Sequence, residues 1–142
     1  MFKKVLGVAG VAGLAFALAA PALAQSHTLR ANISFEFQVG EKVMPAGDYF
    51  VQVNSQGFVQ VMDVAATDRT NLVWTGTRKD INLGQTVAKL VFNRYGNQAF
   101  LSEVWDGTSL YGYTIAKSHT ERELARTAST SAPEILTVLA RR

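Results

Sequence analysis

The residues best suited to catalysis or metal binding are few in this chain and poorly spaced. The imidazoles are His27 and His119, and Glu123 is the one potential ligand a helical turn away from either of them. Zinc sites need three or four nitrogen, sulfur or oxygen ligands held at short spacings. Ser118 directly precedes His119, but neighbours on a helix do not face each other, and the chain has neither a cysteine nor a Gly-x-Ser-x-Gly nucleophile motif. We therefore expect no catalytic residue, no metal site and no cofactor.

Aromatic side chains offer a second kind of chemistry, which is stacking against a sugar ring or an apolar ligand. Tyr111 and Tyr113 stand two residues apart, so a strand would place both rings on one side. The alternative is that such rings fill the core of the domain, which is the more common position for Trp and Tyr. The candidate ligand-binding residues are Trp74, Tyr95, Trp105, Tyr111 and Tyr113.

The first 24 residues have the pattern of a secretory signal peptide. Lys3 and Lys4 precede an uncharged apolar run from Val5 to Ala20, and Ala22-Leu23-Ala24 is the small-x-small sequence that a signal peptidase cuts. The run is too short for a membrane-spanning helix. We therefore expect a bacterial protein that is periplasmic or secreted, has no membrane span after cleavage, and begins at Gln25 in its mature form.

The charge of the mature chain excludes one large class of partner. Two of the 14 basic residues lie in the signal peptide, so 12 remain against 11 acidic residues and the net charge is +1. Nucleic-acid binding normally needs a clustered basic surface, so we expect no nucleic-acid partner. Since the chain has no cysteine, its fold must be held by packing alone.

The mature chain, residues 25–142, is predicted to be a single all-β domain of seven or eight short strands. The clearest strand is Asn32–Val39, in which every second residue is apolar. The remaining strands are expected at 49–53, 58–63, 72–75, 87–94, 98–105 and 108–115. Short strands at this regular spacing favour an antiparallel β-sandwich or a small flattened barrel.

Turn-forming residues separate the predicted strands. Pro45-Ala46-Gly47-Asp48 and Tyr95-Gly96-Asn97 are each predicted to form a turn, and Asp106-Gly107 suits a two-residue type I′ hairpin. The longest polar stretch, Gly76–Thr86, is expected to be a loop or to contain a short edge strand near residues 81–83.

The pattern changes after the last of these strands. Ser118 and Glu121 form a capping box, in which each side chain can satisfy a free backbone N–H of a helix start. This predicts a helix over about 118–129, which Pro133 separates from a final strand over about 134–140. Because that strand is apolar on both faces, we expect it to be central or covered.

Four segments resemble a known group of proteins: Phe35-Glu36-Phe37-Gln38-Val39-Gly40, Pro45-Ala46-Gly47-Asp48-Tyr49, Leu90-Val91-Phe92-Asn93-Arg94-Tyr95-Gly96 and Glu121-Arg122-Glu123-Leu124-Ala125. Together they make the chain similar to a group of small exported β-rich proteins that is common in acidobacterial genomes. The resemblance implies an exported β-rich fold. It implies no activity, ligand or catalytic residue.

The expected function is a non-enzymatic binding or interaction module of the cell envelope, with an unknown partner. The alternative is a carrier for a small ligand or a carbohydrate in an aromatic-lined pocket, and an enzyme ranks third. An internal apolar cavity would indicate the carrier, whereas an exposed strand edge or apolar patch would indicate the interaction module. The cations Arg122, Arg126, Arg141 and Arg142 are expected to be solvated, with a Glu123–Arg126 pair, or else to meet an acidic partner.

Overall fold

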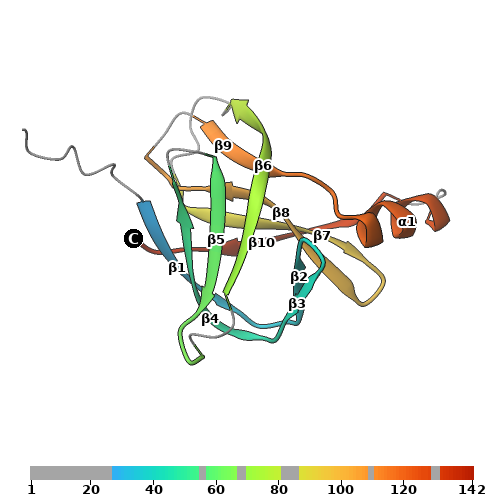
Figure 1. Cartoon of the computed structure of the whole chain (residues 1–142), viewed down its shortest axis with the longest axis horizontal. Helices are drawn as coiled ribbons and strands as arrows, with labels where there is room; N and C mark the ends of the chain where they lie inside the picture. Colours follow the sequence, from blue (N-terminus) through green and yellow to red (C-terminus); the bar gives the residue numbers. More distant parts are fainter. Residues whose placement is uncertain (1–26, 55–56, 67–69, 81–86, 109–110, 129–131) are drawn as a thin grey trace, which may run out of the picture.

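The computed structural model describes residues 27–54, 57–66, 70–80, 87–108, 111–128 and 132–142 (Figure 1). The predicted signal peptide and the possible strand at 81–83 lie outside the described residues. The elements in chain order are β1 (His27–Ile33), β2 (Phe37–Val39), β3 (Lys42–Met44), β4 (Gly47–Val53), β5 (Phe58–Asp63), β6 (Thr70–Asp80), β7 (Lys89–Tyr95), β8 (Gln98–Trp105), β9 (Tyr111–Ile115), α1 (His119–Thr127) and β10 (Glu134–Leu139). The predicted all-β fold with one short helix before the last strand is confirmed.

The strands form two layers that one long strand connects. β1, β4 and β5 are antiparallel neighbours in one layer, while β9, β8, β7 and β10 follow each other in the second. β6 belongs to both, because residues 70–74 pair with β5 and residues 75–80 pair with β9. The pairing is irregular between Thr75 and Thr77, where Gly76 lets the strand bend from one layer into the other.

The structure corrects the expectation of a loop from Gly76 onward. Residues up to Asp80 continue β6 as a strand. Polar composition suggested a loop, but hydrogen bonding to β9 keeps the backbone extended, and it does not require apolar side chains.

A single pair of residues closes the opposite side of the molecule. The N–H of Arg30 in β1 donates to the carbonyl of Arg141 at 2.7 Å, and the N–H of Arg141 donates back to the carbonyl of Arg30 at 2.8 Å. The two layers are therefore joined at both edges, by β6 on one side and by this bridge on the other. The fold is a flattened barrel with one weakly closed seam.

The strand predicted over Asn32–Val39 is divided in two. β1 pairs with β4 in one layer, and after a bend at residues 34–36 the chain continues as β2, which pairs with β8 in the other layer. The alternation of buried and exposed residues continues across the bend, so Ile33, Phe37 and Val39 are all buried. This division and the short β2–β3 hairpin raise the number of described strands to ten.

Aromatic rings fill the space between the layers. The ring of Phe37 lies 5.0 Å from Tyr49 and 5.4 Å from Phe92 in edge-to-face contacts, and Phe35 lies 5.1 Å from Phe92. The Tyr49 hydroxyl donates to the carbonyl of Pro45, which fastens the predicted Pro45–Asp48 turn to the core. Such contacts add to the free energy gained by burying apolar area.

β8 and β9 pair antiparallel as predicted, but the predicted two-residue turn between them is absent. β8 ends at Trp105 and β9 begins at Tyr111, so the connection through Asp106-Gly107 is longer than two residues. The buried Asp106 carboxylate accepts a hydrogen bond from the backbone N–H of Thr108 at 2.9 Å, which favours a side-chain-stabilised turn over a type I′ hairpin. Another turn predicted from the sequence, at Tyr95-Gly96-Asn97, is present as a two-residue connection at Gly96-Asn97 between β7 and β8.

Candidate functional site

The structure places two of the five aromatic candidates at opposite ends of the β7–β8 hairpin. Tyr95 lies beside the turn, whereas Trp105 pairs with Lys89 at the far end, and both side chains are buried. Tyr113 is half-buried and packs against the core. The side chains of Trp74 and Tyr111 lie outside the described residues. The described rings form no shared platform, and a ligand site made from these residues stays a prediction.

Trp105 is enclosed by its neighbours on the outer face of the sheet. A Cβ atom added to Gly112 would lie 2.5 Å from the indole, so the ring rests directly on the glycine backbone. The indole N–H donates to the Glu103 carboxylate at 2.9 Å, and the Lys89 ammonium lies 5.6 Å from the ring centroid. These contacts give Trp105 a structural role, since they provide an acceptor for the indole N–H and cover the face of the ring.

A buried carboxylate fastens α1 to the sheet. Ser118 caps the helix as predicted, accepting from the N–H of Glu121 at 3.1 Å. The Glu121 carboxylate does not turn back to the helix start. It accepts from the hydroxyl of Tyr95 at 3.2 Å and from the amide of Asn93 at 3.1 Å, with 3% of the residue exposed. Burial and the neighbouring Glu121 charge raise the pKa of Tyr95.

Glu41, between β2 and β3, holds the same helix from another element. Its carboxylate accepts from the backbone N–H of His119 and from the hydroxyl of Thr120, both at 2.7 Å. The Thr120 hydrogen bond, followed by those from the backbone, holds the pKa of Glu41 below its usual value. The positive end of the helix dipole is thus already occupied by an acid of the chain itself.

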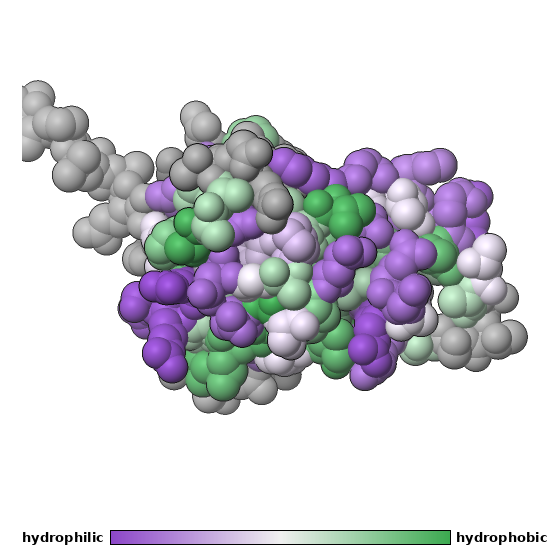
Figure 2. All heavy atoms as spheres, turned by 90° about the horizontal axis from the view of Figure 1, so that it is seen from below, coloured by the Kyte–Doolittle hydropathy of each residue, from purple (hydrophilic) through white to green (hydrophobic). Residues whose placement is uncertain are grey.

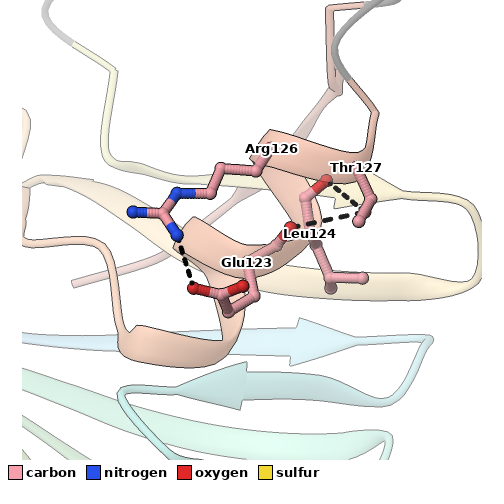
Figure 3. A network of polar contacts seen from close by, with 4 residues as sticks. All are labelled: Glu123, Leu124, Arg126 and Thr127. Carbon is pink, nitrogen blue, oxygen red and sulfur yellow. Dashed lines mark hydrogen bonds and ion pairs between the residues drawn. The ribbon is translucent and has the colours of Figure 1, made fainter.

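The predicted Glu123–Arg126 pair is present on the exposed side of α1, at 3.1 Å (Figure 3). In the same close-up, the hydroxyl of Thr127 donates to the carbonyls of Glu123 and Leu124. The four arginines expected near the chain end lie in two separate places, because α1 is at the right of Figure 1 and the C-terminus at the left.

The described residues contain neither a cluster of metal ligands nor a membrane-spanning helix. Within the described ranges, no three His, Asp or Glu side chains lie close enough to share a metal ion. None of the helical residues in those ranges forms a helix long and apolar enough to cross a membrane.

The last strand differs from its prediction in a way that matters for function. β10 was expected to be covered on both faces, but Ile135 is 59% exposed and Leu139 is 70% exposed, while Leu136 and Val138 pack against the core. The prediction was wrong because β10 has the barrel interior on one face, while its other face lies outside the barrel. Sequence pattern alone cannot identify which apolar face is left uncovered.

One edge of β10 is also open. Ala140 donates its N–H to Ala88 on the β7 side at 2.9 Å, whereas Arg141 bonds to Arg30 on the other side. Because backbone groups alternate between the two edges of a strand, Ile135, Thr137 and Leu139 point their N–H and C=O groups away from β7. Among the residues that the structure describes, no backbone group pairs with these three. We call these three positions the open edge.

The open edge lacks the features that usually protect exposed strands. Natural edge strands carry lysines, prolines or bulges that prevent pairing with another chain. Here the side chains are Ile, Thr and Leu, and their pairing with β7 is regular. Val87, just before β7, adds a third exposed apolar side chain near the Arg141 end.

A positively charged groove of about 880 Å³ lies at the Arg141 end of the open edge. Arg30, Arg141 and Arg142 line it together with Leu139 and a single acid, Asp48. The guanidinium of Arg30 lies 3.7 Å from the Asp48 carboxylate, and both side chains are about half exposed, so this pair is weak. The excess of two cations makes this end of the edge suited to a negative group.

The face shown in Figure 2 carries separate hydrophobic patches with polar residues between them.

Comparison of the chain with protein-family models, with curated proteins and with solved structures finds no match. Among the described residues, we take the open edge as the candidate site. The one sequence signal for it was the last strand's lack of any charged residue between Glu134 and Arg141.

Proposed function

We propose that the mature chain is an exported, non-enzymatic interaction module of the bacterial cell envelope, and that its partner adds a strand to the open edge of β10. The observation that carries the proposal is the coincidence of unpaired backbone groups and exposed apolar side chains at Ile135 and Leu139. In strand addition, main-chain hydrogen bonds supply affinity and alternate side chains supply specificity. Both elements are available on this edge.

The packing of the interior favours an interaction module over a ligand carrier. A carrier needs an internal cavity lined by apolar side chains. Here Phe37, Tyr49 and Phe92 occupy the space between the layers with their rings in contact. The groove beside the open edge is a surface feature lined by charged side chains.

Photo-crosslinking in the native cell envelope tests this proposal. A photoreactive amino acid replaces Ile135, and in a matched control it replaces Val43, which is 53% exposed on β3. We expect a discrete adduct from position 135 and none from position 43. Equal labelling at both positions, or none at position 135, would refute strand addition at β10. The same preparation gives the mass of the unlinked chain, which we expect to begin at Gln25.

A further inference from the structure

We propose that the strand added to the open edge is β10 of a second copy of this chain, in antiparallel orientation. This inference rests on the proposed use of the open edge and names its partner. The order of residues along β10, the charges at its two ends and the few hydrogen bonds across the seam each support it.

The open edge is symmetric about its middle residue. It presents an apolar side chain at Ile135, a hydroxyl at Thr137 and an apolar side chain at Leu139. When two such strands pair antiparallel around Thr137, Ile135 of each copy lies opposite Leu139 of the other, and the two threonines lie opposite each other. Apolar pairs and Thr–Thr pairs are favourable directly across an antiparallel ladder. A two-fold interface requires this kind of self-complementarity.

The charges at the two ends of β10 also match in this orientation. Glu134 begins the strand and is half exposed even though it pairs with Arg94, while Arg141 and Arg142 follow its end. Antiparallel pairing brings Glu134 of one copy toward the two arginines of the other, and it does so twice because of the symmetry. A parallel arrangement would place like charges together. Complementary charges of this kind fix register and orientation in interfaces.

The seam beside β10 is held by few hydrogen bonds. β1 and β10 share the single bridge from Arg30 to Arg141, and β1 ends at Ile33 without a second one. In Figure 1, β1 and β10 run in different directions from the C-terminal end of the chain. Because the bridge is a single residue pair, it can open to admit an incoming strand that pairs with β10 as far as Leu139.

Cysteine crosslinking tests the inference directly, because the chain has no cysteine and any disulfide must join two copies. Residues paired by hydrogen bonds across an antiparallel ladder have Cα atoms about 5.5 Å apart, within the roughly 4.4–6.8 Å range of disulfides. We expect Thr137→Cys to form a covalent dimer under mild oxidation and Val43→Cys, a control at another exposed strand position, to remain monomeric. Absence of the dimer at position 137, or equal dimer at both positions, would overturn the inference.

The backbone contribution can be removed without removing the side chains around it. Thr137→Pro deletes the N–H that points into the open edge and leaves the bonds to β7 intact. Sedimentation of the mature wild-type chain should give the mass of a dimer at high concentration, and Thr137→Pro should give a monomer. A wild-type monomer at all concentrations, or a variant that still dimerises, would contradict the inference.

The two experiments separate this inference from the proposed function. An Ile135 photo-adduct with twice the mass of the mature chain supports both. An Ile135 adduct of another mass, together with no dimer from Thr137→Cys, refutes the second copy and leaves strand addition by another protein. No adduct and no dimer would refute both.

Discussion

The helix end and the seam of this flattened barrel satisfy their backbone and polar groups in opposite ways. At the helix end, Glu41 and Ser118 cap the first turn of α1, and the Glu121 carboxylate accepts hydrogen bonds from two residues of β7. Along the seam, one residue pair closes the barrel and three positions of β10 keep backbone groups that no described backbone group pairs with. Such a row on a regular strand is a surface to which another strand can be added.

One short stretch of sequence contains both a helix that is fixed to the sheet and a strand with an open edge. α1 and β10 are separated by six residues, yet α1 is fixed to the sheet while β10 borders the open seam. The helix end is specified by residues far apart in sequence, such as Glu41 and Asn93, whereas β10 is hydrogen-bonded along its length to β7 alone among the described strands. The helix end, which has several independent contacts, should tolerate few substitutions. An edge strand such as β10 can instead pair with a further strand.

The largest expected effect is in the core that supports both regions. Phe37 is 1% exposed and contacts Tyr49 and Phe92 edge-to-face. We expect Phe37→Ala to lower the free energy of unfolding by about 3–5 kcal/mol, measured by urea denaturation. Phe35 is partly buried, so Phe35→Ala should cost clearly less. Equal effects of the two substitutions would mean that Phe35 is as deeply packed as Phe37.

The helix end should depend on Glu121 more than on any exposed acid. Glu121→Ala leaves the Tyr95 hydroxyl and the Asn93 amide without their acceptor beneath α1. Leaving buried donors unsatisfied costs about 1–3 kcal/mol, and the same loss is expected in urea denaturation. The control Glu123→Ala removes only an exposed i,i+3 pair and should cost less than about 0.5 kcal/mol. If the two variants are equally stable, the buried cluster does not hold the helix.

The stability of the helix end should also respond to alkaline pH. The pKa of Tyr95 is raised in the folded chain, so the folded state keeps that proton at a pH where the unfolded state loses it. The contribution of Tyr95 to stability is complete below a pH of about 10 and is lost as the pH rises through the folded pKa. A plot of the thermal unfolding midpoint against pH should therefore have a different slope for the wild type than for Tyr95→Phe above that pH. Parallel curves would contradict a Tyr95–Glu121 interaction.

Particular residues show what the sequence can and cannot predict. The alternation around Ile33 and Phe37 and the Ser118 cap were predicted correctly, because both depend on local spacing. The bend that divides Asn32–Val39 was missed, since it follows from pairing with two different strands far along the chain. The site was missed for the same reason. Ile135 and Leu136 are equally apolar, and tertiary structure alone decides which of them is covered.

The smallest expected effect on stability is at the open edge, and it is the sharpest test of the comparison between the helix end and the seam. Thr137→Pro removes an N–H that faces away from β7, whereas Val138→Pro removes one that faces β7 and also disturbs a core contact. At concentrations low enough to keep the chain monomeric, we expect Thr137→Pro to change the free energy of unfolding by less than about 0.5 kcal/mol. Val138→Pro should cost about 3 kcal/mol or more.

The contrast between these neighbouring substitutions tests the direction of the backbone groups on β10. If both prolines are strongly destabilising, Thr137 has a partner within its own chain and the edge is not open. If both are tolerated, β10 contributes little to the barrel, and the seam would lie at β7 instead. A large effect at Val138 with almost none at Thr137 is the result that a paired inner edge and a free outer edge require, because the two positions differ chiefly in which edge their N–H groups face.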